Sequence, residues 1–278
     1  GMLYYNMGKR QKSLQYLKES ISMDPQAAFA PCGYCLKKFI AEIYTDLKQY
    51  SEAELIYTEV IKSGYLGQQF SVYYDLIDFY IERNAFDKAR TRLNEVAALD
   101  SSHFVKLNSL YLEYREGKAD FDSLINEVVV FRKSMLVSDT DSSLISSLYF
   151  MEAGMYEDKY PDDKSEYSNL LQQALIYDPA NNQVVLLLAQ TYYDENEFTR
   201  LNELLDQSLS YITNPDVLSW LFSYVIYGAM YENKDDLLEQ SLTRFYDTGI
   251  LTCEMWKEWK FDKYLKKYPF AKSICIKK

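Results

Sequence analysis

Two cysteines separated by two residues are the pattern in this sequence that most directly suggests chemistry. Cys32-Gly33-Tyr34-Cys35 follows Pro31. A C-x-x-C pair at the start of a helix can acquire a lowered thiol pKa and exchange disulfides. In redox proteins of that type the pair follows a buried strand, whereas the pattern here predicts a helix on either side. A disulfide between Cys32 and Cys35 in an oxidising compartment is therefore favoured over catalysis, and thiol-redox function stays open as an alternative.

A metal site would need more ligands close to the same pair. Zinc sites of this kind combine two close pairs, and Cys253 and Cys275 are separated by 21 residues on a terminal segment. We therefore expect no metal and no cofactor, with metal binding at Cys32 and Cys35 kept as the alternative.

The remaining reactive residue types do not form a catalytic set. His103, the only histidine, lies at a polar junction, and no nucleophile is placed beside it by the sequence. The pairs Asp162-Asp163 and Asp235-Asp236 fall in expected turns, where Asp commonly caps helices. The chain contains no Gly-rich phosphate-binding loop. We therefore expect the protein not to be an enzyme.

Composition and charge restrict the fold and the partner. Of 278 residues, 48% are hydrophobic and only 9 are Gly and 6 Pro, which favours helices over a sheet with many tight turns. A formal charge of −11 repels phosphate backbones, so nucleic acid is not expected as a partner. Because no leader or membrane-spanning run is recognisable, a cytoplasmic location is favoured. A periplasmic one would require that a leader was removed upstream of Met2, where Gly1 looks like a cloning remnant.

The sequence repeats one spacing of tyrosine, small and bulky residues, and this spacing is typical of helices. Three tyrosines are each followed nine positions later by a small residue and four positions further on by a bulky one. The sets are Tyr4/Ser13/Leu17, Tyr44/Ala53/Tyr57 and Tyr80/Ala89/Leu93. Offsets of three and four place side chains on one helical face. Each set therefore predicts two antiparallel helices that cross at the small residue and must stack on neighbours to bury their apolar faces.

These residues resemble the tetratricopeptide repeat, a helix–turn–helix unit of 34 residues. The pattern of its first helix is followed by Ile40-Ala41-Tyr44, by Val185-Leu188-Ala189-Tyr192 and by Tyr224-Tyr227-Gly228-Tyr231, and that of its second helix by Ser13-Leu17-Ser20-Pro25. The resemblance implies an all-α, right-handed α-solenoid over residues 1–250, with roughly seven units of which the first is incomplete. Residues 251–278, basic and aromatic, are expected to form a C-terminal capping segment. Repeat tyrosines, including Tyr114, Tyr192 and Tyr231, are expected in the core.

In the tetratricopeptide family the first helix of each pair lines a concave groove that holds a peptide. The residues that match groove positions here are Lys38, Glu42, Asp46, Tyr74, Asp78, Glu82, Gln183, Gln190 and Asp194. Glu42 stands where the carboxylate-binding branch of the family has Asn, which argues against acidic C-terminal ligands. The implied groove is acidic and favours a partner that carries Lys or Arg.

The resemblance therefore implies a non-catalytic scaffold that binds a peptide or protein partner. Two alternatives stay open beside it. One is a thiol-redox or metal-binding protein that uses Cys32 and Cys35. The other is a sensory or assembly segment of a larger bacterial protein, which would explain the incomplete first unit.

Overall fold

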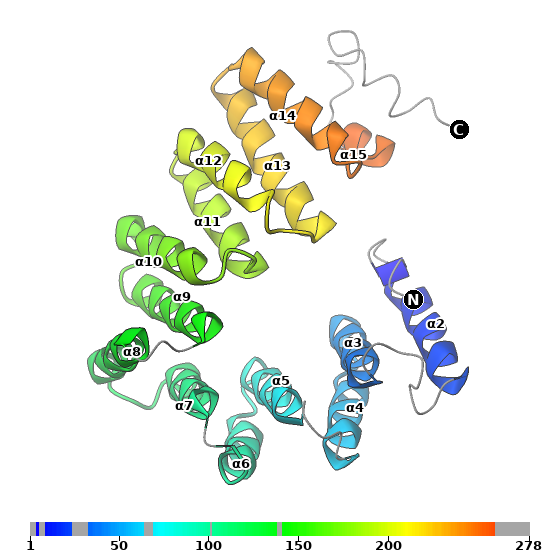
Figure 1. The fold of residues 1–278 in the computed structure, drawn as a ribbon, viewed down its shortest axis with the longest axis vertical. Coiled ribbons are helices and arrows are strands. Elements are labelled where there is room, and N and C mark those ends of the chain that lie inside the picture. The colour runs from blue at the N-terminus through cyan, green and yellow to red at the C-terminus, as the bar shows by residue number, and fades with distance from the viewer. Residues whose placement is uncertain are drawn as a thin grey trace. The chain divides into compact units, whose positions relative to one another are not determined.

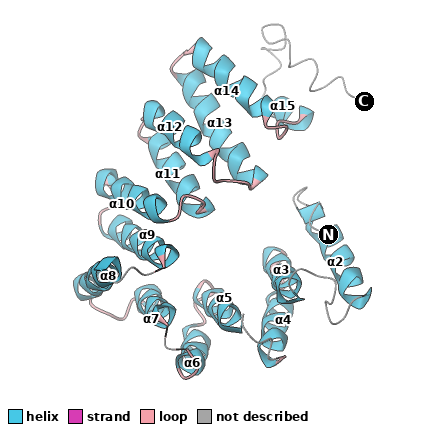
Figure 2. Cartoon of the chain, in the orientation of Figure 1, coloured by secondary structure: helices cyan, strands magenta, loops and turns pink. Residues whose placement is uncertain are grey.

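Helices account for the regular structure of this protein. The computed structural model describes residues 4–5, 9–23, 33–63, 69–100, 102–137 and 141–258, without the side chains of residues 33–35, 69–70 and 258. Across these ranges fourteen helices with defined bounds follow one another, α2 to α15, and no strand occurs (Figures 1 and 2). The predicted all-α class is confirmed.

The chain divides into two compact units, residues 1–127 and 128–278, and the boundary falls inside α8 (Phe121–Val137). The first unit contains α2 (Arg10–Met23), α3 (Gly33–Asp46), α4 (Tyr50–Lys62), α5 (Gln69–Ile81), α6 (Phe86–Ala97) and α7 (His103–Glu116). The second contains α9 (Ser142–Lys159), α10 (Lys164–Tyr177), α11 (Asn182–Asp194), α12 (Phe198–Ser208), α13 (Pro215–Tyr231), α14 (Asp235–Asp247) and α15 (Cys253–Glu258).

Within each unit, helices that are neighbours in sequence pack as pairs. These pairs are α3/α4 and α5/α6 in the first unit, and α9/α10, α11/α12 and α13/α14 in the second (Figure 1). Successive pairs also touch, through α4 and α5 in the first unit and through α10 and α11 in the second. This is the arrangement expected when a thin helical pair cannot bury its apolar face alone.

In four of these pairs the two helices are joined by the same type of turn. The turns hold a residue with positive φ, namely Lys48, Asn84, Asn196 or Asn233, with φ between 55° and 59°. The next amide donates to the carbonyl five residues upstream, as from Gln49 to Tyr44 at 2.8 Å and from Lys234 to Ala229 at 2.9 Å. The bond satisfies a carbonyl that the end of the helix would otherwise leave without a partner. Asn tolerates the left-handed conformation better than most residues, which accounts for three of the four positions.

The shared turn defines where paired helices cross. In each of the four pairs, two residues twelve positions apart are at most 2% exposed, one on each helix: Ala41/Ala53, Ile77/Ala89, Ala189/Leu201 and Ile226/Leu238. Ala53 and Ala89 are fully buried, as the sequence predicts. Ser13, the corresponding residue of the first set, is fully buried as well.

The predicted repeat register is wrong in α13. The turn aligns Ala229, not Tyr231, with Tyr44, Tyr80 and Tyr192, because Ala229 supplies the carbonyl that accepts from the turn. Tyr231 is 70% exposed and is not a core residue. Trp220, Tyr224, Tyr227 and Tyr231 recur at helical spacing on a face other than the one that carries the buried Phe222 and Ile226, so this aromatic periodicity placed the unit two residues from its true register. Gly228 is needed where it stands, because a Cβ there would lie 2.4 Å from the Phe198 ring.

The last described helix, α15, belongs to the second unit. Leu251 and Trp256, at the start of the predicted capping segment 251–278, are buried. Residues 259–278 of that segment lie outside the described part of the chain. Among the helices that the structure describes, none is both long enough and apolar enough to cross a membrane, as expected.

Candidate functional site

An acidic cleft of about 280 Å³ lies in the first unit between α3 and α5. Four of the predicted groove residues line it, Glu42, Asp46, Asp78 and Glu82. The other lining residues are Tyr5, Thr45, Tyr57, Asp75, Phe79 and Arg83. We call this set the acidic cleft.

Helical spacing brings the carboxylates together. Glu42 and Asp46 are four positions apart on α3, so their side chains project from the same face. Asp75, Asp78 and Glu82 follow at intervals of three and four along α5 and its C-terminal end, which likewise gives one face. Two acidic helix faces therefore border one cleft.

Three cations accompany these five carboxylates. Lys38 joins the two helices, because its Nζ lies 2.7 Å from Asp75 on α5 and 3.9 Å from Glu42 on α3. Arg10 lies 2.9 Å from Asp46. Arg83 lies 3.8 Å from Glu82. The set keeps an excess of negative charge.

Arg83 is held mainly by the apolar wall of the cleft. Its guanidinium lies 3.9 Å from the centre of the Phe79 ring and 4.3 Å from that of Tyr50, and it donates to the Phe79 carbonyl at 2.6 Å. Such stacking is favourable for a planar cation. The cleft therefore already accommodates one guanidinium, that of Arg83, against an aromatic ring.

Asp78 is the carboxylate of the cleft that no cation neutralises. Within the described residues, no ion pair or hydrogen bond involves its side chain. Although solvent reaches the side chain, the surrounding protein limits hydration of the charged form, and Asp75 and Glu82 add negative charge; together they raise the pKa of Asp78 to about 7, with Lys38 opposing. Burial also raises the pKa of Glu42, Lys38 again opposing. An added cation would relieve this repulsion.

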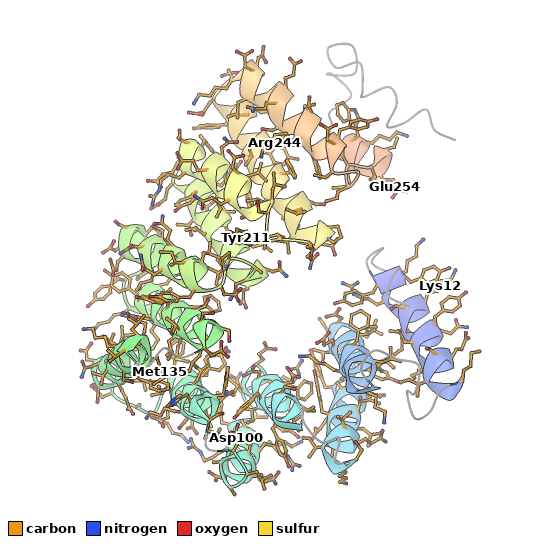
Figure 3. All side chains as sticks on the ribbon, viewed as in Figure 1. Lys12, Asp100, Met135, Tyr211, Arg244 and Glu254 are labelled. Atoms are coloured by element: carbon orange, nitrogen blue, oxygen red, sulfur yellow. The ribbon has the colours of Figure 1, made fainter. Side chains whose placement is uncertain are left out.

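Tyr74, also predicted for the groove, does not line the cleft. Its hydroxyl donates to the Asp100 carboxylate at 2.6 Å, and its ring lies against Phe104. Asp100, labelled in Figure 3, lies in the connection between α6 and α7. Lys38 is not a lining residue either, but it contacts two carboxylates that are.

A smaller cleft in the second unit contains two further predicted residues. Gln190 and Asp194 line a cavity of about 170 Å³ together with Glu157, Lys164, Tyr167, Leu187, Thr191 and Glu195. Lys164 pairs with Glu157 at 2.7 Å, which leaves two carboxylates exposed at the cleft, Asp194 and Glu195. Gln183 is exposed one turn or more away and does not line it.

Sequence reasoning missed Asp75, the residue that ties α5 to α3. The available signal was its spacing, since Asp75 precedes Asp78 by three positions and therefore shares its helical face. Family positions were carried over one by one, and Asp75 is not among them. The aromatic lining residues Tyr57 and Phe79 were missed for the same reason.

The cysteine prediction falls largely outside the described residues. Cys32 and Cys275 lie in undescribed segments, and Cys35 lies in α3 with its side chain undescribed. Cys253, at the start of α15, is disulfide-bonded. His103 is the first residue of α7. Among the described side chains, no group of three Asp, Glu, His or Cys residues is placed to hold a metal ion.

No protein-family model matches this chain, and no curated protein matches it significantly.

Proposed function

We propose that the protein is a non-catalytic scaffold of tetratricopeptide-like helical pairs, stacked as a right-handed solenoid, that binds a basic segment of a partner protein. The repeated turn and the buried positions twelve residues apart support the repeat. The acidic cleft supports the binding role, and Asp78 is the observation that carries it.

The charge arrangement of the acidic cleft selects a cationic ligand. Asp78 has no ion-pair partner within the described residues. Its pKa is raised first by the limited hydration of the charged form and then by repulsion from Asp75 and Glu82, and a bound Lys or Arg would relieve that repulsion. An acidic ligand would meet Glu42, Asp75 and Glu82 and be repelled. Charge complementarity of this kind sets specificity more than affinity.

Arg fits the cleft better than Lys. The rings of Tyr57 and Phe79 form part of its lining, and a guanidinium can stack on a ring while it donates two parallel hydrogen bonds to a carboxylate. Arg83 already adopts the stacked half of this arrangement on Phe79. We therefore expect the bound segment to prefer Arg.

A direct test compares fluorescein-labelled Gly/Ser peptides of equal length that carry Arg, Lys or Glu. Fluorescence anisotropy on the full chain should give the order Arg, then Lys, then no binding for Glu. Asp78→Asn and Glu42→Gln should each weaken binding of the Arg peptide about two- to five-fold, the range for exposed charge pairs. Glu59→Gln, an exposed residue of α4 outside the cleft, is the matched control and should change little.

Preference for the Glu peptide would contradict the proposal. So would equal weakening by Glu59→Gln and Glu42→Gln, because the attraction would then come from overall charge and not from the cleft.

A further inference from the structure

A second and larger cavity lies in the second unit, on a different face of α11. α10 and α12 both pack on α11 and leave between them a groove of about 580 Å³. Its floor includes Leu188 and Tyr192 of α11. The small cleft described above uses Leu187, Gln190 and Asp194 of the same helix, which lie on another face at helical spacing.

Each of the two walls of the groove consists of a row of side chains from one helix. On α10 the row includes Gln172, Ile176 and Pro179, the last just beyond the helix. On α12 it includes Arg200, Leu204 and Ser208. A row of eight residues on a helix extends about 12 Å. An elongated cavity of this kind suits a segment of polypeptide better than a compact small molecule.

Apolar side chains line the groove without being covered. Ile176 is 65% exposed and Tyr211 is 55% exposed, whereas Leu204 and Leu188 are buried in the wall and floor. Tyr211, labelled in Figure 3, lies where the chain leaves α12, and its amide donates to the Ser208 carbonyl at 3.0 Å. Exposed Tyr and Ile beside buried Leu provide an anchoring surface for apolar side chains of a ligand.

The charges of the groove specify the ligand further. Arg200 is already occupied, because it pairs with Glu197 at 2.6 Å and stacks over the Tyr192 ring at 4.6 Å. Glu203 is exposed, and its carboxylate has no ion-pair or hydrogen-bond partner among the described residues. The available charge is therefore negative and calls for a cation on the ligand.

We propose that this groove binds a short amphipathic segment of a partner protein. Its apolar side chains pack on Ile176 and Tyr211, and a Lys or Arg beside them pairs with Glu203. The segment is distinguished from a ligand of the acidic cleft by its need for apolar anchors. The proposal does not depend on the acidic cleft, since the two sites share no residue.

The test selects a phage-displayed library of random dodecapeptides against the full chain and measures the enriched peptides by fluorescence anisotropy. The expected peptides carry apolar residues at helical spacing together with Lys or Arg. Ile176→Glu should weaken their binding at least about tenfold, as loss of an anchor does. Glu203→Gln should weaken it about two- to five-fold.

Matched variants test whether the enriched peptides occupy this groove. Val137→Glu, the same kind of change at an exposed apolar position of α8, should leave affinity unchanged. Asp78→Asn should also leave it unchanged, and failure of the acidic-cleft proposal would show instead in the Arg-peptide assay.

Three outcomes would overturn the proposal. The first is a library that yields no enriched peptide, and the second is binding that Ile176→Glu and Val137→Glu weaken equally. The third is a dimer in light scattering that Ile176→Glu dissociates, because the groove would then belong to a second copy of this chain.

Discussion

At the scale of single residues, Asp78 decides the chemistry of the acidic cleft. It stands between Asp75 and Glu82 on one helical face, while Lys38 contacts Asp75 and Glu42. The pKa of a carboxyl group rises when the surrounding protein limits its hydration and when other carboxylates lie beside it. Among the carboxylates of the cleft, Asp78 is therefore the one that a bound cation would stabilise most.

Asp78→Asn should change how stability depends on pH. Because folding raises the pKa of Asp78 to about 7, its stabilising contribution is present below the unfolded pKa of about 4 and is lost as pH rises toward 7. Asn does not ionise, so the melting temperature of the variant relative to wild type should rise between about pH 4 and pH 7. Thermal unfolding by circular dichroism measures it. A difference that stays constant or falls over this interval would contradict the assignment, and Glu59→Gln is the control.

Much of the acidic cleft could be predicted from the sequence, and the limits have physical causes. Glu42, Asp46, Asp78 and Glu82 were identified because they match groove positions of the tetratricopeptide family, which lie on one face of the first helix of each pair. Tyr74 matches such a position too, but its hydroxyl bonds to Asp100, twenty-six residues away, and no local pattern indicates that bond.

At the scale of elements, the turn with positive φ organises four helical pairs. It fixes the crossing position, since the buried residues Ala41/Ala53 and Ala189/Leu201 have the same offsets from the positive-φ residue in both pairs. The sequence signals of this turn are Asn84, Asn196 and Asn233, and the fourth turn uses Lys48. Aligning on the turns would have placed α13 correctly, where alignment on aromatic residues misplaced it.

Substitutions at Asn196 should distinguish backbone conformation from side-chain contacts. Asn196→Ala should cost about 1 kcal/mol of unfolding free energy, because Ala is disfavoured at a φ of 59°. Asn196→Gly should cost little or nothing, because Gly adopts this conformation readily. Urea unfolding measures both variants. If Ala and Gly were tolerated equally, the turn would not require the left-handed conformation.

Ala89 tests the helix crossing. Ala89→Leu should destabilise the first unit by about 1–3 kcal/mol through overpacking, since Ala89 is fully buried against its neighbours. Ala97→Leu makes the same change at an exposed position of the same helix and should stay within about 0.5 kcal/mol of wild type. The urea midpoint of each variant decides the matter; equal effects at the two positions would show that the crossing lies elsewhere.

At the scale of the whole molecule, charge is the property that the clefts share. The chain carries 41 acidic and 30 basic residues, and carboxylates remain exposed in both described clefts. The fold class followed from the spacing of apolar residues and from low Gly and Pro content. The groove between α10 and α12 did not, because its walls come from helices of two different pairs, both of which contact α11.

Binding of the Arg peptide should weaken several-fold as NaCl rises from about 50 to 500 mM, because the Debye length falls to a few ångströms. Asp78→Asn should make this dependence shallower, since fewer charges then attract the peptide. Anisotropy titrations at several salt concentrations measure both slopes. Affinity that does not respond to salt would contradict an electrostatic cleft.

The most direct test of the central claim is a crystal structure of the chain with the Arg peptide bound. We expect a guanidinium between α3 and α5, within hydrogen-bonding distance of the Asp78 carboxylate and against the rings of Tyr57 and Phe79. A peptide seated elsewhere, with the acidic cleft empty, would contradict it.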